Sequence, residues 1–176
     1  GGRPNLAKYL QAAGYHTAIV GKWHLGSDPT GFDVWNILPG QGVYHNPTFI
    51  EMGQRKQHTG YVTDLITDYS IDFLKDAQER KQPFLLMMHH KAPHRPWEPP
   101  TRYYRWLADA TIPEPPTLFD DYTGRGTPAH TQKMEIARDM TLAGDLKVRP
   151  PGKGKLDAEF QATYGVRNRA FENANL

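Results

Sequence analysis

Residues 13–26, with the sequence AGYHTAIVGKWHLG, point to the fold class. The middle of this segment, Tyr15 to Gly21, is short, rich in β-forming residues and closed by glycine, as is typical of a strand. Apolar side chains recur at helical spacing over residues 6–13, with Pro4 suited to the first turn and Gly14 to the end. A helix that leads directly into a strand is half of an α/β unit.

The next part of the chain repeats this order. Residues 22–60 are rich in Gly, Pro, Asn and Asp, which predicts a long loop region with short extra strands. Apolar residues mark one helical face from Val62 to Phe73, and this helix should end between Lys75 and Arg80. Residues 84–88, FLLMM, are continuously apolar and predict a strand buried on both faces. The whole pattern predicts a parallel sheet covered by helices.

The C-terminal half has a different character. Residues 94–116 are rich in proline and aromatic residues, which predicts an irregular segment that crosses the surface. Residues 132–146 are predicted to be helical, residues 150–155 to form a linker or loop, and residues 157–164 to open another helix. Asp120 and Asp121 lie among turn-forming residues, and we interpret them as a turn or loop cap.

Composition narrows the possible functions. The 176 residues carry a net charge of only +2, which does not indicate a basic surface for nucleic acid. No apolar run approaches the ~20 residues of a membrane span. The absence of cysteine excludes disulfides and thiolate metal sites within this segment. The first residues show no signal peptide and no initiator Met, so the chain is expected to begin inside a longer protein.

Two cationic clusters follow the two predicted strands. Residues 21–26, GKWHLG, come after the first, and residues 89–96, HHKAPHRP, after the second. Ligands of open α/β sheets bind beyond the carboxyl ends of the strands. A charge pair at 4 Å contributes about 4 kcal/mol at an effective dielectric near 20. A lysine and two histidines there would hold an oxyanion and transfer protons to it.

Other interpretations of these clusters remain open. Lys-x-His is common on solvated surfaces, and His89 and His90 fit one inward and one outward side chain at the end of a strand. Histidines also bind zinc, but the sequence has no helical His-x-x-x-His pair with a glutamate base.

The first segment, AGYHTAIVGKWHLG, resembles the second signature of the type I, formylglycine-dependent sulfatases. The segment PFLLMMHHKAPHRPW resembles the one that carries their later sulfate-site histidine, and the resemblance runs from Asn5 to Val148. It implies an alkaline-phosphatase-like parallel sheet covered by helices, incomplete in this chain. Residues 1–148 would be part of the N-terminal catalytic domain and residues 149–176 its continuation. The layout is most similar to bacterial glycan sulfatases of the mucin-desulfating or N-acetylglucosamine-6-sulfatase kind.

The resemblance also implies roles for three residues. Lys22 would contact the sulfate and the formylglycine hydroxyl, and His24 would orient that hydroxyl. His94 would bind the sulfate and protonate the leaving alcohol. The side chains of these residues should converge on one pocket, within about 10 Å of one another. Lys22 and His24 should point the same way in an extended segment, with Trp23 turned into packing.

Four further residues are candidates for contact with a sugar. Tyr44 and His45 fall in the long loop region, although they also fit a turn before Pro47. Arg95 and Trp97 could bind a sugar's charge and ring, although they also fit packing of the proline-rich segment.

The departures from the family pattern are equally specific. The chain has no cysteine and no Ser-x-Pro/Ala-x-Arg string, so the formylglycine nucleophile is expected upstream. The calcium of the parent protein would be held by Asp and Asn residues, and no metal ligand is assigned within this segment. The chain alone is therefore expected to be inactive.

The resemblance implies a sulfated sugar or glycan as substrate and a periplasmic or extracellular location. Two alternatives remain: a phosphatase or phosphodiesterase of the alkaline phosphatase superfamily, and an inactive truncated fragment that binds anions. An upstream Cys/Ser-x-Pro/Ala-x-Arg motif would favour the sulfatase. An unmodified Thr or Ser together with zinc ligands would favour the phosphatase.

Overall fold

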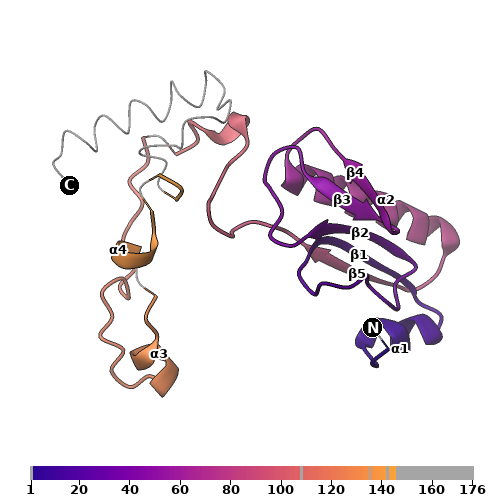
Figure 1. Ribbon diagram of the computed structural model, residues 1–176, viewed down its shortest axis with the longest axis horizontal. Helices are drawn as coiled ribbons and strands as arrows, with labels where there is room; N and C mark the ends of the chain where they lie inside the picture. The colour runs from indigo at the N-terminus through magenta and orange to yellow at the C-terminus, as the bar shows by residue number, and fades with distance from the viewer. Residues whose placement is uncertain (1, 108, 135, 142, 146–176) are drawn as a thin grey trace. The chain divides into compact units, whose positions relative to one another are not determined.

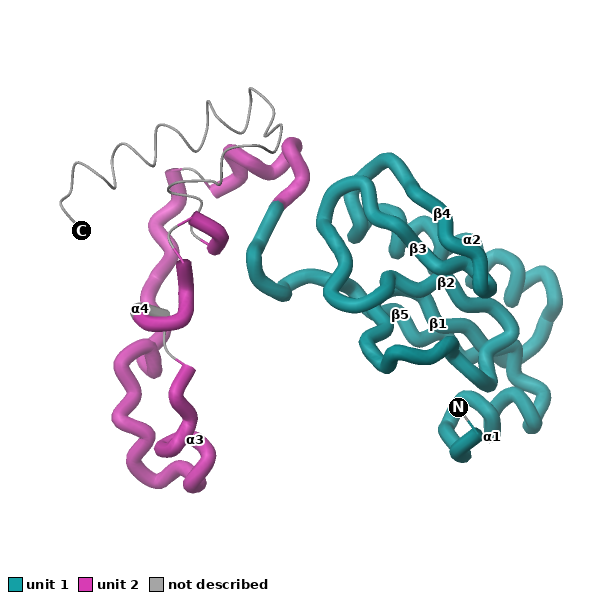
Figure 2. Tube along the Cα trace, viewed as in Figure 1, with its two compact units in different colours: residues 1–98 teal, residues 99–176 magenta. Residues whose placement is uncertain are grey.

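The computed structural model describes residues 2–107, 109–134, 136–141 and 143–145. The chain divides into two compact units, unit 1 (Gly1–Glu98) and unit 2 (Pro99–Leu176) (Figure 2). All seven residues singled out above as site candidates lie in unit 1. The predicted boundary between residues 148 and 149 falls outside the described residues and stays a prediction.

Unit 1 is a five-stranded sheet with two helices (Figure 1). Its elements in chain order are α1 (Leu6–Ala12), β1 (His16–Trp23), β2 (Val34–Pro39), β3 (Thr48–Glu51), β4 (Gln54–Gln57), α2 (Val62–Arg80) and β5 (Phe84–His89). The strand order is β4-β3-β2-β1-β5. Strands β2 and β5 pair in parallel with β1, whereas β3 and β4 continue the sheet in antiparallel fashion. The predicted α/β class is confirmed, with a sheet that is mixed rather than wholly parallel.

Helix α1 ends before Gly14, as the sequence indicates, but Pro4 precedes its N-cap and does not lie in its first turn. The side chain of Asn5 caps it by accepting a hydrogen bond from the backbone N–H of Lys8 at 3.0 Å. Gly14 follows the helix with φ of 87°, a conformation that glycine adopts without steric cost. The chain then enters β1 two residues later, as predicted.

The core lies on both faces of β1. Ala18, Ile19 and Val20 are completely buried at the centre of the strand. Val20 packs on one face with Val62 and Ile66 of α2, so this helix covers that face. Ile19 faces the opposite side and packs with two other buried side chains, those of Trp35 and Ile37. The alternation of faces along one strand produces these two clusters.

Two expectations about the strands need correction. The predicted loop region of residues 22–60 contains β2, β3 and β4, so its short extra strands make up most of the sheet. Strand β5 is not buried on both faces, since Phe84 and Met88 are 48% and 38% exposed. It ends the strand order and pairs with β1 on one side in the described part of the chain. An apolar run alone does not distinguish a central strand from an edge strand.

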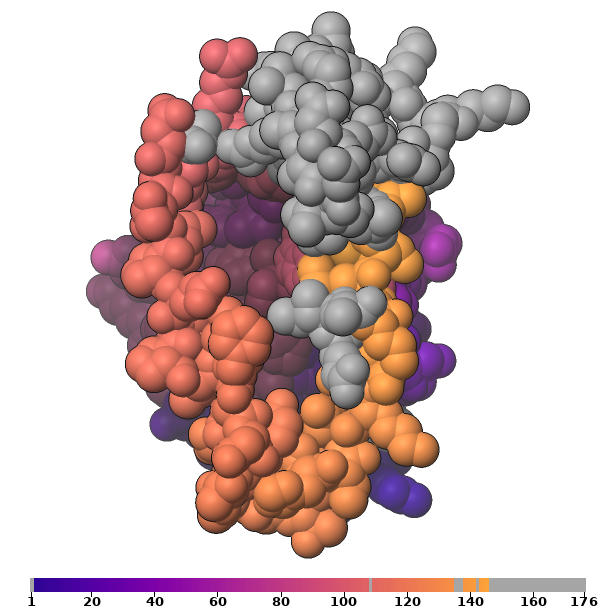
Figure 3. Space-filling model, turned by 90° about the vertical axis from the view of Figure 1, so that its left-hand side faces the viewer, coloured from indigo at the N-terminus to yellow at the C-terminus, as the bar shows by residue number. Residues whose placement is uncertain are grey.

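Unit 2 contains short elements: the 3-10 helix η1 (Thr101–Tyr103), α3 (Thr127–Thr131) and α4 (Ile136–Asp139). Most of its described side chains are exposed (Figure 3).

The irregular segment predicted over residues 94–116 is confirmed, apart from η1. Of the predicted helix over residues 132–146, the described residues form only the short α4, and Gln132 is extended and ends α3. The predictions for residues 149–176, including a helix from Asp157, lie outside the described residues. No helix in the described ranges combines the length and apolar character that a membrane span requires.

Candidate functional site

The two cationic clusters lie at the same edge of the sheet. β1 and β5 are direct parallel neighbours, with Gly21 opposite His89 in the register (Figure 1). Gly21 has φ of 104°, and a Cβ there would lie 1.9 Å from the carbonyl oxygen of His89. This glycine therefore permits the close approach of the two strands.

Lys22 is the second-last residue of β1, which ends at Trp23. Its Nζ donates a hydrogen bond to the side-chain oxygen of Gln41 at 2.6 Å. Gln41 follows β2, whose carboxyl end lies beside that of β1 because Lys22 pairs with Leu38. The acceptor is a neutral amide, so this hydrogen bond does not pair Lys22 with a negative charge.

Lys91 is a second cation in the same place, and we did not single it out from the sequence. Its side chain is only 5% exposed, and Nζ donates to the backbone carbonyl of Gln41 at 3.0 Å. The ammonium also lies 4.7 Å from the centre of the Tyr44 ring, a cation–π contact. Burial, and then the nearby charge of Lys22, lower the pKa of Lys91, while Glu98 opposes this. The ammonium groups of Lys22 and Lys91 therefore both donate a hydrogen bond to Gln41.

Tyr44 connects this pair of lysines to His94. It is 3% exposed, packs in the α2-side core, and donates its hydroxyl proton to the His94 carbonyl at 2.6 Å. Burial, followed by the charges of Tyr61 and Glu98, raises the pKa of Tyr44 to about 12, so the hydroxyl stays a donor. Tyr44 thus supports Lys91 with its ring and His94 with its hydroxyl, and its predicted contact with substrate stays a prediction.

His94 is presented by a turn that begins at Lys91. The His94 backbone N–H donates to the Lys91 carbonyl at 3.0 Å, which folds the chain back as the sequence suggested. The exposed ring places Nδ1 2.5 Å from the carbonyl oxygen of Arg95. Because a carbonyl only accepts, Nδ1 carries a proton in this arrangement and Nε2 is left for a ligand.

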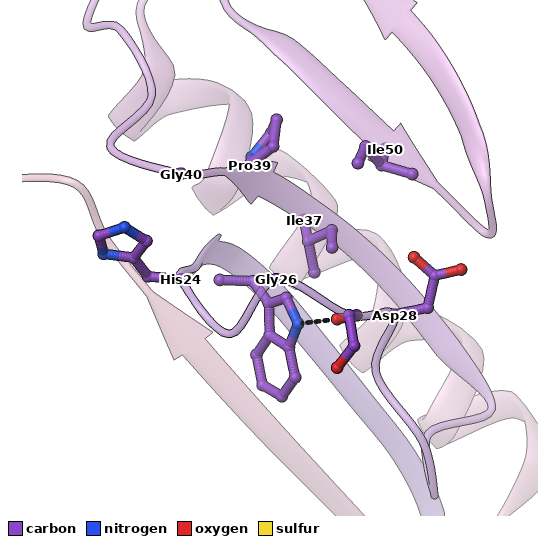
Figure 4. A pocket seen from close by; sticks show the side chains of 9 residues that line it. His24, Gly26, Asp28, Ile37, Pro39, Gly40 and Ile50 are labelled. Atoms are coloured by element: carbon purple, nitrogen blue, oxygen red, sulfur yellow. Dashed lines mark hydrogen bonds between the residues drawn. The ribbon is translucent and has the colours of Figure 1, made fainter. Parts of the chain in front are cut away.

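His24 lies in the lining of a separate pocket of about 250 Å³. Figure 4 shows His24 at one end of this pocket, near Gly40, and Asp28 at the other end. Trp23 also lines it and packs against the Ile19 cluster, as predicted, with its indole N–H on the Ser27 carbonyl at 2.6 Å. Lys22 and His94 thus belong to one connected network, whereas the convergence of His24 with them remains a prediction.

The other predicted sugar contacts surround this network. The His45 ring lies 5.2 Å from the ring of Tyr61, which stacks on Tyr44. The indole N–H of Trp97 donates to the Pro93 carbonyl at 2.6 Å, and 39% of Trp97 is exposed. Arg95 is half-buried next to His94. Contact of His45, Arg95 and Trp97 with a ligand remains a prediction.

The described residues do not provide a metal site. Across them, no group of three or more His, Cys, Asp or Glu side chains is placed to hold a metal ion. Asp120 and Asp121 accept hydrogen bonds from the backbone N–H groups of Tyr122 and Thr123, at 3.1 and 2.8 Å. The interpretation of this pair as a turn is confirmed.

The fold and the paired lysines at the carboxyl ends of its strands define an α/β protein with a cationic site. Comparison with known proteins identifies the family. The Sulfatase family model matches residues 1–124, so the chain belongs to the sulfatase family. The resemblance inferred from GKWHLG is confirmed.

Within the family, the chain is similar to glucosamine sulfatases. It is 48% identical over 151 residues to an N-acetylglucosamine-6-O-sulfatase of Bacteroides thetaiotaomicron, covering 84% of this chain and 27% of that protein. It is 31% identical over 115 residues to the goat N-acetylglucosamine-6-sulfatase, covering 57% of this chain and 20% of that protein. The chain therefore spans about a quarter of the length of these curated relatives.

A solved structure gives the same result. The structure of BT4656 in complex with its substrate D-glucosamine-2-N,6-O-disulfate matches all of this chain and 40% of that one. The TM-score is 0.84 and the sequence identity is 38%. The alkaline-phosphatase-like sulfatase fold expected from the resemblance is thereby confirmed.

Proposed function

We propose that this chain is part of an enzyme that hydrolyses sulfate monoesters of a glucosamine-type sugar. The observation that carries the proposal is the pair of ammonium groups, Lys22 and Lys91, at the carboxyl ends of two neighbouring parallel strands. Both donate to oxygens of Gln41 that carry no charge, and neither forms a salt bridge in the described part of the chain. The charge of Glu98 also acts on Lys91, but the two ammonium groups together suit a bound oxyanion.

The chain's own residues then have distinct tasks. Lys22 binds the sulfate through its charge, and His24 would orient a hydroxyl nucleophile that the described residues do not themselves supply. An oxygen that comes from water in the net reaction bonds to sulfur as the bond between sulfur and the sugar oxygen breaks, and the electron pair of the broken bond stays on the sugar oxygen. His94 supplies a proton to it from Nε2, which requires the doubly protonated ring because Nδ1 is already bonded to the Arg95 carbonyl.

Calcium and formylglycine belong to the family mechanism, and the described residues do not fit them. The sequence contains no cysteine, and the turn carboxylates Asp120 and Asp121 are engaged by backbone N–H groups. A calcium ion requires six or more oxygen ligands. No step is therefore assigned to these groups through the residues of this chain.

The names of the relatives support the substrate class and the location. Two of them are N-acetylglucosamine-6-sulfatases, and BT4656 was solved with a glucosamine disulfate. An extracellular sulfatase of Drosophila melanogaster is 33% identical over 124 residues. We propose a 6-sulfated glucosamine unit as substrate, with His45, Arg95 and Trp97 around the sugar, and an exported location for the enzyme.

The leaving group tests this assignment. In the gene product that carries this sequence, we expect sulfate release from N-acetylglucosamine-6-sulfate and from 4-nitrocatechol sulfate. His94→Gln should lower kcat for the sugar sulfate by about 10²- to 10⁴-fold, because a sugar alkoxide needs a proton to depart. The nitrocatechol leaves without one, so its kcat should change far less. Steady-state kinetics on both substrates measures the difference.

The exposed His130→Gln provides the control, since this residue lies on α3 of unit 2. Equal losses on the two substrates would contradict the role of His94 as the acid. Release of phosphate from glucosamine-6-phosphate in preference to sulfate would favour the phosphatase alternative.

A further inference from the structure

The turn that follows β2 is shaped to present Gln41. The Gly42 N–H donates to the Pro39 carbonyl at 3.1 Å, and Gly40 and Gly42 have φ of 57° and 62°. A Cβ on Gly42 would lie 2.3 Å from Cδ2 of Leu38, which is completely buried. Glycine at this position therefore lets the turn lie against the core, next to the end of β1.

Gln41 contacts the two lysines through different atoms. Its side-chain oxygen accepts from Lys22, and its backbone carbonyl accepts from Lys91. Lys91 is fixed by burial and by the Tyr44 ring, so its bond anchors the backbone of the turn. A side-chain substitution at Gln41 removes the contact with Lys22 and leaves the carbonyl for Lys91.

We propose that Gln41 is a positioning residue that holds the Lys22 ammonium in place for the sulfate before substrate binds. This inference rests on the proposed function. A neutral amide aligns the lysine without neutralising it, whereas a carboxylate would compete with the substrate. A lysine that is already ordered loses less side-chain entropy when it binds an anion, which favours binding.

Two variants separate alignment from charge. Gln41→Ala frees Lys22 and should raise both KM for N-acetylglucosamine-6-sulfate and the inhibition constant of inorganic sulfate by roughly 3- to 10-fold, the effect of ordering one long side chain. The change in kcat should stay below about twofold, because the side-chain entropy of Lys22 is lost when the anion binds and not in the chemical step. Gln41→Glu keeps the shape but pairs Lys22 with a carboxylate, so both constants should rise further than in Gln41→Ala.

The experiment uses the gene product that carries this sequence, with Gln54→Ala as the matched control. Gln54 is an exposed glutamine of β4, and its substitution should leave both constants unchanged. Wild-type protein that releases no sulfate would overturn the proposed function and this inference together. Active wild-type protein, with unchanged KM and sulfate inhibition in Gln41→Ala and Gln41→Glu, would overturn this inference alone. A fall in kcat without a change in KM would indicate a merely structural role and would also overturn it.

Discussion

At the scale of single residues, the two ends of β1 have opposite electrostatics. The carboxyl end carries Lys22 and faces Lys91, whereas the amino end carries the buried His16 between two carboxylates. His16 lies 3.4 Å from Asp33 and 2.9 Å from Asp76. In the described residues, Lys22 and Lys91 form no salt bridge, although the charge of Glu98 acts on Lys91, so the carboxyl end keeps a net positive charge.

Asp33 should make the stability depend on pH. Burial alone would raise its pKa, but the hydrogen bonds from the Thr17 backbone, Gln11 and the Thr17 hydroxyl, together with the charge of His16, lower it below 3.8. A carboxyl group with a lowered pKa stabilises the fold above its unfolded pKa, and this contribution is lost as the pH falls through the folded pKa. Asp33→Asn should therefore reduce the free energy of unfolding by about 1 kcal/mol at pH 6, and the difference should shrink below pH 3.8.

Urea unfolding of both proteins at pH 6 and pH 3 measures this effect. Asp72→Asn is the comparison, because Asp72 is exposed on α2 and its 3.5 Å pair with Lys75 is worth little. A difference between wild type and Asp33→Asn that stays constant over the pH range would show that hydrogen-bond geometry, and not the charge, is responsible.

At the scale of the elements, the contact between β1 and β5 places the two cationic clusters side by side. Hydrogen bonding between parallel strands fixes the register, so the opposition of Gly21 and His89 determines where Lys22 and Lys91 end up. The helix between them, α2, covers one face and provides the crossover. The site therefore depends on a strand contact that only glycine permits.

Substitution of this glycine should separate the strands. Gly21→Ala forces a positive φ on alanine and places Cβ against the His89 carbonyl, so we expect a loss of stability above about 3 kcal/mol. Hydrogen exchange of the β5 amides should accelerate. Gly26→Ala is the control, because Gly26 has φ of 69° but no atom within 4 Å of an added Cβ. Its cost should be only about 1 kcal/mol, and similar losses in the two variants would mean that the close approach is unimportant.

At the scale of the whole molecule, the described fold and the candidate site belong to unit 1. Its strands, both longer helices and the three core clusters come from residues 1–98. The described part of unit 2 contains only short helical elements and few buried side chains. The buried contacts that stabilise the described fold are therefore made mainly within unit 1.

Truncation after Glu98 tests this division. We expect residues 1–98 to retain the sheet, because the buried contacts of Ala18, Ile19 and Val20 are made within unit 1. Hydrogen exchange should show the amides of Ile19 and Val20 protected to a similar degree in the truncated and complete chains. Loss of that protection would mean that unit 1 needs unit 2 in order to fold.

Local patterns in the chain were sufficient for α1, β1, α2 and the position of β5, because each has a clear period or apolar run with turn residues at its ends. The motif around Lys22 and His24 likewise revealed the sulfatase family, since its residues are contiguous. The helix predicted over 132–146 is reduced to α4 in the described residues, because weak periodicity does not outweigh the local turn conformation. The exposure of β5 depends on which strands pair beside it, a nonlocal property.

The supporting residues of the site became visible only in three dimensions. Gln41 and Lys91 are 50 positions apart, yet Lys91 and Lys22 both contact Gln41 because β2, β1 and β5 lie side by side. The burial of Tyr44 and its hydrogen bond to the His94 carbonyl likewise join segments that are distant in the sequence. Neighbouring residues fix local conformation, whereas burial, charge proximity and hydrogen-bond partners arise from segments that meet when the sheet assembles.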